Sequence, residues 1–208
     1  MPPGQQRESR METDASLAQD LCARLCHDLV GPLGTVAGAL DMLADDPEAA
    51  ELARDAAAEI RRRLKFWRVA CGGGTGPIAG SEVLALSEGL VAGGRARLEL
   101  VGLAAEEVFP PTLAQMVLLA ITLTGEALPR GGVVRLERSG EALVLSAEGR
   151  IVAWPAGLAT ALEGGTGGGP REAMAALLLR LAGEAGWSVA PAAPGLPAGL
   201  RLSPPVRG

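Results

Sequence analysis

Apolar residues between Leu21 and Leu43 recur every three or four positions, the spacing of one face of an α-helix. On a helical wheel that advances about 100° per residue, the stripe lies within about 80° of Leu25. It comprises Leu21, Leu25, Leu29, Leu33, Val36, Leu40 and Leu43. The pattern therefore predicts one amphipathic helix over residues 15–45.

A second helix follows almost at once. Asp46 is the expected N-cap, Pro47 the first helical residue, and the glycines after Cys71 the end. Its apolar stripe comprises Ala49, Leu52, Ala56, Ile60, Leu64, Trp67 and Cys71. The short connection predicts an antiparallel hairpin. Because one hairpin leaves a long apolar face uncovered, we expect two chains to pair as a symmetric homodimer with a four-helix bundle.

Beyond a glycine-rich linker the pattern changes to helices interleaved with β-rich runs. We expect helices over 81–93, 111–128 and 171–186, a strand over 95–102, and a β-hairpin over 131–149 that turns at Ser139–Gly140. The runs 187–193 and 198–204 are candidates for final strands. This order predicts an α/β sandwich with its helices on one face. The expected organisation is a flexible tail over 1–16, the hairpin over 17–72, a linker over 73–80 and the α/β domain over 81–208.

Composition narrows the class of protein. Hydrophobic residues make up 48% of the 208 residues, which predicts a folded chain, and the net charge of -5 argues against a nucleic-acid partner. The basic run 61–68 is read either as a solvated helix face or as a docking surface for an acidic protein. We expect no membrane span and no export signal, and therefore a cytoplasmic protein with reduced thiols.

Cys22, Cys26 and His27 lie close together in sequence, which raises the question of a metal site. Cys22 and Cys26 are one helical turn apart, but His27 is rotated about 100° from Cys26. Cys71 is remote, and structural zinc sites usually need four ligands. We therefore expect no metal site and interpret the cysteines as small buried hydrophobes.

His27 is the single histidine of the chain. It lies about 200° from Leu25 on the wheel, so it should face solvent. Gly31, Gly34 and Gly38 share that outer face, although each glycine costs a helix about 1 kcal/mol relative to alanine. Small residues there would let another surface approach the imidazole. Helix geometry alone leaves open that His27 is a surface residue with no role.

Pro32 and Asp28 lie close to this histidine along the chain. Pro32 should remove the backbone hydrogen bond to the Asp28 carbonyl and kink the helix. The Asp28 carboxylate is placed to hold the imidazole tautomer or to favour its cationic form.

The segment "RLCHDLVGPLGTVAGALDML" resembles the dimerisation and phosphoacceptor hairpin of bacterial sensor histidine kinases. Its "RLCHD" start is closer still to the ChpT-type histidine phosphotransferases, and "ALPRGGVVRLE" extends the likeness into the second domain. The resemblance implies that residues 81–208 form a degenerate, Bergerat-like ATP-binding domain. Such kinases hold Mg²⁺ with an asparagine and read adenine with an aspartate. This chain has no asparagine and no aspartate after Asp55. The glycines that open 164–186 resemble a remnant of the nucleotide lid, but we expect no bound cofactor.

The resemblance predicts a histidine phosphotransferase of a multistep phosphorelay. His27 would take a phosphoryl group from a receiver-domain aspartate of a hybrid histidine kinase and pass it to a response regulator. Asp28 would support the imidazole, while Mg²⁺ and a cationic side chain would come from the partner receiver. The expected partner-binding residues are Arg24, Leu29, Val30, Gly31, Pro32, Gly34 and Gly38.

Three further expectations concern activities other than transfer. Many sensor kinases carry Thr or Asn at the place of Gly31 for phosphatase activity, so hydrolysis of a partner's phosphate is not expected. An autophosphorylating kinase is disfavoured by the missing asparagine and aspartates. A non-catalytic dimeric adaptor, or pseudokinase, that only binds receivers stands as the alternative.

Overall fold

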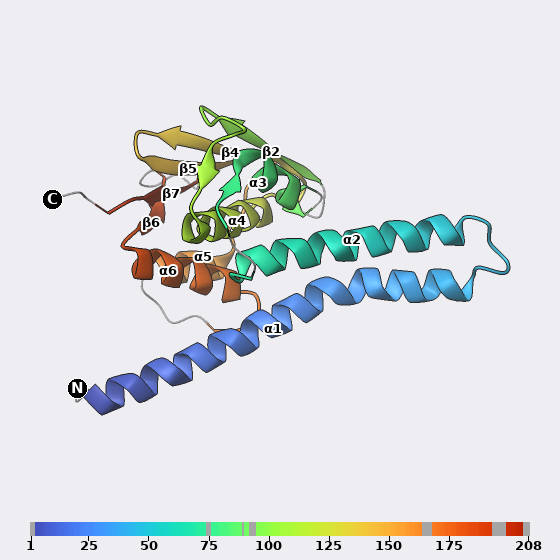
Figure 1. The fold of residues 1–208 in the computed structure, drawn as a ribbon, viewed down its shortest axis with the longest axis horizontal. Helices are drawn as coiled ribbons and strands as arrows, with labels where there is room; N and C mark the ends of the chain where they lie inside the picture. Colours follow the sequence, from blue (N-terminus) through green and yellow to red (C-terminus); the bar gives the residue numbers. More distant parts are fainter. Residues whose placement is uncertain are drawn as a thin grey trace.

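The computed structural model describes residues 3–73, 76–88, 90–91, 95–163, 168–192 and 199–205, with side chains from residue 13 onward except at Ala156. Two long helices, α1 (Pro3–Asp41) and α2 (Ala49–Ala70), form the predicted antiparallel hairpin. The hairpin projects well beyond the rest of the molecule (Figure 1). In the connecting loop the Asp46 carboxylate accepts a hydrogen bond from the Glu48 N–H at 2.8 Å. The helix α2 begins at Ala49, slightly later than expected.

The predicted flexible tail over residues 1–16 differs from the structure, in which α1 begins at Pro3. Residues 3–16 continue α1, because no glycine or proline interrupts the chain between Gly4 and Gly31. This extension also has tertiary contacts. Asp14 forms an ion pair with Arg180 of helix α6 (Ala173–Ala185), and α6 packs against α1. The start of α1 is thereby tied to the α/β part of the chain.

Five strands form the main sheet, in the order β2-β4-β5-β7-β6. They are β2 (Ala96–Val101), β4 (Gly132–Ser139), β5 (Ala142–Glu148), β6 (Ser188–Pro191) and β7 (Gly199–Ser203). β2 and β4 are parallel, and every other pair is antiparallel. The β4–β5 hairpin turns at Ser139–Gly140, as predicted, with Gly140 at a φ of 63° that favours glycine.

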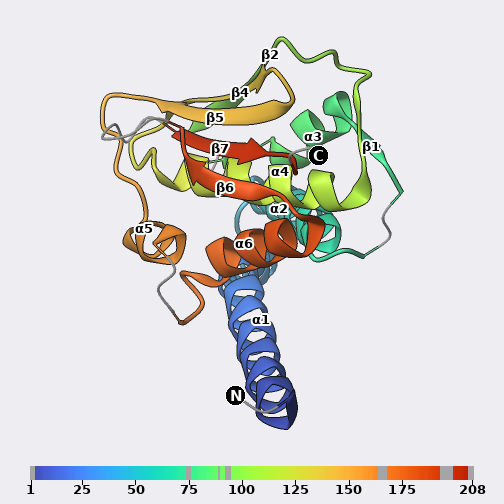
Figure 2. The same ribbon diagram turned by 90° about the vertical axis from the view of Figure 1, so that its left-hand side faces the viewer.

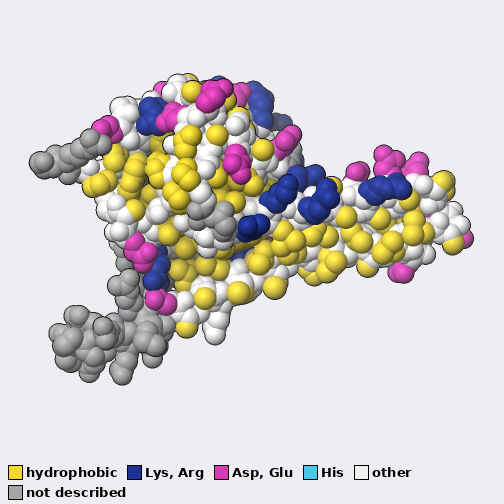
Figure 3. Space-filling view, viewed as in Figure 1, with side chains coloured by type: hydrophobic (Ala, Val, Ile, Leu, Met, Phe, Trp, Pro, Cys, Tyr) yellow, Lys and Arg dark blue, Asp and Glu magenta, His cyan; other side chains and the backbone are white. Residues whose placement is uncertain are grey.

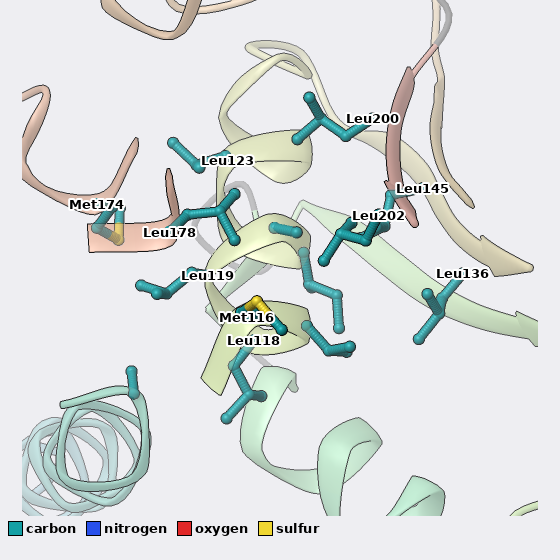
Figure 4. Close-up of a cluster of buried hydrophobic side chains, with 14 of the residues drawn as sticks. Met116, Leu118, Leu119, Leu123, Leu136, Leu145, Met174, Leu178, Leu200 and Leu202 are labelled. Atoms are coloured by element: carbon teal, nitrogen blue, oxygen red, sulfur yellow. The ribbon is translucent and has the colours of Figure 1, made fainter. Parts of the chain in front are cut away.

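Helices cover one face of this sheet, which confirms the mixed sandwich expected from the sequence (Figure 2). The central helix is α4 (Pro111–Glu126), and α6 and α3 (Gly80–Ser87) flank it. Apolar side chains of α4 meet alternate residues of β4, β5 and β7 (Figure 4). Fully buried members of this core include Met116, Leu119, Leu123, Leu136, Leu145, Leu178 and Leu202. The continuous apolar character of α4 follows from this position, because neighbours surround it on nearly all sides.

Three short elements were not predicted. β1 (Ile78–Ala79) and β3 (Val108–Phe109) pair as a separate two-stranded ribbon, and α5 (Ala156–Leu162) precedes α6. Two-residue strands carry too little pattern to be recognised in a sequence. The predicted helix over 81–93 is observed as α3, and part of its expected range lies outside the described residues.

The apolar stripe of the hairpin is only partly covered within one chain. Ala39, Ala49, Ala56 and Trp67 are buried, whereas large apolar residues farther along the hairpin are exposed. The exposed set comprises Val30, Leu33, Leu40, Met42, Leu43, Leu52 and Leu64. A space-filling view shows apolar side chains running along both helices (Figure 3). Much of the face that was expected to need a second hairpin is therefore open in this structure.

The prediction that the three cysteines are buried is wrong, because Cys22, Cys26 and Cys71 are all exposed. On the wheel, Cys22 and Cys26 lie about 60° and 100° from Leu25, at the border of the apolar stripe. Although Cys71 is exposed, neighbouring atoms partly desolvate its thiol and raise its pKa, and Cys22 raises it further. Within the residues that the structure describes, no helix is long and apolar enough to cross a bilayer.

Candidate functional site

His27 lies on the outer face of α1, and its side chain is 82% exposed. The wheel predicted this orientation. Gly31, Gly34 and Gly38 lie farther along the helix, and a Cβ added at any of them would meet nothing within 4 Å. Packing within this chain therefore does not require glycine at these positions. Together with Val30, which is 65% exposed, they leave a low surface beside the imidazole.

Asp28 is the nearest polar neighbour of the imidazole. Its Oδ1 lies 3.5 Å from Nδ1 of His27. Arg24 Nε donates to the same oxygen at 3.1 Å, and the indole N–H of Trp67 donates to Oδ2 at 3.3 Å. Both carboxylate oxygens are thus engaged, and the side chain is only 18% exposed. Asp28 is held in place and approaches His27 from the Nδ1 side, which leaves Nε2 directed away from it.

The backbone carbonyl of Asp28 also has a partner. Pro32 lies inside α1 and supplies no N–H to this carbonyl. Arg63 of α2 donates from NH1 to the Asp28 oxygen at 2.9 Å, while its other nitrogens bind Glu59. The hydrogen bond that proline removes is therefore replaced from the second helix. This bond fixes the two helices relative to one another within one turn of His27.

Arg24 joins the hairpin to the α/β part of the chain. Its NH2 donates to Glu126, the last residue of α4, at 2.5 Å, while its Nε binds Asp28. Burial opposes the charge on Arg24, but Glu126 and Asp28 outweigh it and raise the pKa of the guanidinium. Burial raises the pKa of Glu126 despite the attraction of Arg24. Carboxylate, guanidinium and carboxylate thus form a chain from α4 to the neighbour of His27.

Two clefts flank this chain of charges. One has a volume of about 330 Å³ and lies behind Asp28, between the hairpin and α4. Its lining includes Arg24, Arg63, Trp67, Thr122 and Glu126. The other, of about 880 Å³, lies beside His27 and is bounded by α1 and the segment before α6. Among the described side chains, no group of three or more His, Cys, Asp or Glu residues is placed to hold a metal ion.

The predicted partner-binding residues divide into two sets. Val30, Gly31, Gly34 and Gly38 are exposed on the outer side, whereas Leu29 and Pro32 are half-buried. Arg24 turns inward, and its side chain is 19% exposed because Asp28 and Glu126 engage it. The glycine surface is thus exposed, whereas Arg24 is engaged inside the molecule.

Sequence reasoning missed three residues of the site, namely Arg63, Trp67 and Glu126. Arg63 and Trp67 belong to the second helix, and the predicted antiparallel hairpin did not specify which residues of the first helix they would face. Glu126 was only part of the predicted helix 111–128 and was given no role. A charged residue that ends an otherwise apolar helix is itself a signal, because buried charges are retained where a partner compensates them.

The model of the histidine phosphotransferase C-terminal domain family matches residues 80–195, more than half of the chain, and the chain belongs to this family. Within it, the chain is a ChpT-type protein. It is 29% identical over 188 residues to protein phosphotransferase ChpT of Brucella abortus (strain 2308), covering 81% of this chain and 86% of that protein.

A solved bacterial phosphotransferase shares the fold. It superposes with a TM-score of 0.74 at 24% identity, covering 90% of this chain and 94% of that structure. Membership in the family supports a role in phosphorelay signalling.

Proposed function

We propose that this protein is a phosphoryl carrier that accepts a phosphoryl group on His27 from one receiver domain and delivers it to another. The observation that carries the proposal is the pairing of an 82% exposed imidazole with a carboxylate fixed by Arg24 and Trp67. An exposed nucleophile on a rigid helix suits transfer between large proteins, since positioning and charge supply most of such catalysis.

The chemistry assigned to His27 is nucleophilic attack by Nε2. Asp28 lies on the Nδ1 side at 3.5 Å, where a carboxylate favours the tautomer that carries its proton on Nδ1 and leaves the lone pair of Nε2 free. That lone pair attacks the phosphorus of an aspartyl phosphate. The Nε2–P bond forms as the bond from phosphorus to the aspartyl oxygen breaks, which regenerates the donor carboxylate. Transfer to the second receiver is the same step in reverse. Mg²⁺ is supplied by the receiver in each step.

Docking of the receiver is assigned to the outer face of α1. Val30, Gly31, Gly34 and Gly38 leave room for another surface close to the imidazole. Leu29 and Pro32 form the edge of this face, where they are half-buried. An upstream hybrid histidine kinase and a downstream response regulator would use the same face in turn.

The uncovered apolar face of the hairpin is assigned to a second copy of the chain. Leu33 and Leu40 are 58% and 53% exposed, and Leu52 and Leu64 of α2 are exposed beside them. Two such faces would bury one another in a four-helix bundle, which leaves both copies of His27 on the outside. Leu40→Glu should convert a dimer to a monomer in sedimentation equilibrium. A wild-type chain that sediments as a monomer at micromolar concentration would contradict this assignment.

Phosphotransfer between purified components tests the carrier function. A receiver domain is labelled at its aspartate, the protein is added without ATP, and acid-labile, base-stable label is sought on the chain. Label is expected on the wild type and none on His27→Ala. If His27→Ala binds receivers and signals as well as the wild type, the chain is a non-catalytic adaptor and the carrier proposal fails.

A further inference from the structure

The cleft beside His27 is bounded by two parts of the chain that are far apart in sequence. One wall is α1, with Ala23, Arg24 and His27. The other is the segment before α6, residues 168–172, together with Pro155 and Glu126. Figure 1 shows this segment passing beside α1. With a volume of about 880 Å³ the cleft is large enough for a phosphoryl group and part of a protein loop.

The segment 168–172 is attached to the same face of α1 that carries His27. The N–H of Gly169 donates to Oδ2 of Asp20 at 2.9 Å. Asp20 precedes His27 by two helical turns, so the two side chains lie within about 20° on the wheel and about 10 Å apart along the axis. Arg171 follows Gly169 by two residues and lines the same cleft as His27.

Among the described residues, Arg171 is the cation of this cleft that has no carboxylate within ion-pair distance. The other cation, Arg24, is engaged by Asp28 and Glu126. Arg171 is exposed, and no acidic group among the described residues lies within ion-pair distance of it. The remaining carboxylate, Glu172, is directed elsewhere: its side chain packs against Gly157 of α5, where Oε2 is buried. The charge of Arg171 is therefore available to an incoming anion.

We propose that this cleft is a phosphoryl-binding subsite in which the Arg171 guanidinium pairs with the oxygens of the phosphoryl group bound to Nε2 of His27. The inference rests on the proposed carrier function and adds a chemical role for the α/β part of the chain. A phosphoryl group on an exposed imidazole carries about two negative charges. A guanidinium binds such oxygens with two parallel hydrogen bonds. The carrier would then supply a cation itself, in addition to whatever the receiver supplies.

The first experiment needs no partner protein. Phosphoramidate, a small phosphoryl donor, is used to phosphorylate the full chain at His27, and the ³¹P resonance of the phosphohistidine is followed through a pH titration. A neighbouring guanidinium favours the dianion, so the phosphoryl pKa should be lower in the wild type than in Arg171→Gln. Arg171→Lys should restore most of the difference. Asp20→Ala, which removes the acceptor for Gly169, should shift the titration in the same direction as Arg171→Gln.

The matched control is Arg97→Gln, an exposed arginine on the edge strand β2, which should titrate as the wild type does. Thermal unfolding of each variant verifies its fold. Identical titration curves for the wild type and Arg171→Gln would overturn the subsite.

The second experiment separates this inference from the carrier function. With saturating phosphorylated receiver, Arg171→Gln should transfer about tenfold more slowly, the loss expected for one charge-assisted pair in the transition state. Its affinity for unphosphorylated receiver should be unchanged. Transfer at the wild-type rate would refute the subsite and leave the carrier function intact. Absence of transfer in the wild type, together with a shifted ³¹P titration, would refute the carrier function and retain the subsite.

Discussion

The ion pair between Arg24 and Glu126 makes the coupling between the hairpin and the α/β part of the chain measurable. The two side chains are 19% and 26% exposed, and Asp28 shares the guanidinium. Arg24→Gln leaves two carboxylates without their cation. These two carboxylates, Asp28 and Glu126, repel one another, since the charge of Asp28 contributes to the raised pKa of Glu126. Breaking a fully buried pair costs about 3–5 kcal/mol, and partial exposure reduces the expected cost here to about 2 kcal/mol.

Glu126→Gln should cost less, about 1 kcal/mol, because Arg24 keeps its hydrogen bond to Asp28. In the double variant the two costs overlap, so we expect a total of about 2 kcal/mol and a coupling energy of about 1 kcal/mol. In a chain of this size the melting temperature of Arg24→Gln should fall by about 4–8 °C. Chemical denaturation of the wild type, the two single variants and the double variant gives a double-mutant cycle. Arg97→Gln is an exposed control whose free energy of unfolding should change little.

The same variants should also differ in their rates of phosphotransfer. Arg24 holds Asp28, and Asp28 lies beside Nδ1 of His27, so Arg24→Gln should slow phosphotransfer at saturating receiver more than Glu126→Gln does. Costs that add to within about 0.5 kcal/mol would show that the pair carries no coupling. Such additivity would refute the view that α4 stabilises the phosphoacceptor helix through Arg24.

Three further outcomes are expected. Gly34→Ala should stabilise the protein by up to about 1 kcal/mol, since its Cβ meets nothing, and should weaken receiver binding measured by calorimetry; unchanged binding would remove Gly34 from the docking face. Because folding raises the pKa of Glu126, this carboxyl keeps its proton to a higher pH in the folded protein than in the unfolded chain, where its pKa is near 4.5. The free energy of unfolding should therefore fall, relative to Glu126→Gln, as pH rises from 4.5 through the raised value, and a rise would contradict the sign. Trp67→Phe removes the indole donor to Asp28 and should cost about 1 kcal/mol in urea unfolding and slow transfer, whereas full activity would show that Arg24 alone suffices to hold Asp28.

Much of the fold was predictable because its elements are long and periodic. Leucines at helical spacing predicted the hairpin, and the run 111–128 predicted the buried helix α4. The turn at Gly140 followed from the residue pattern of β4 and β5, since glycine suits the positive φ found there. The parallel pairing of β2 with β4 was not predicted, because it depends on how the connecting segment packs on the sheet.

The sequence by itself determined that His27 faces outward, since one residue's place on a wheel depends only on helical geometry and on the apolar stripe. The glycine surface followed for the same reason. Only the tertiary structure decided which groups surround the imidazole. Arg24 looked like a docking residue, yet it binds Glu126, which lies 102 positions away. Gly169 binds Asp20 of α1, and Arg171 lines a cleft with His27, through a segment that no local pattern relates to that helix. Charges find their partners through the packing of distant elements, and a periodicity within one element cannot encode that choice.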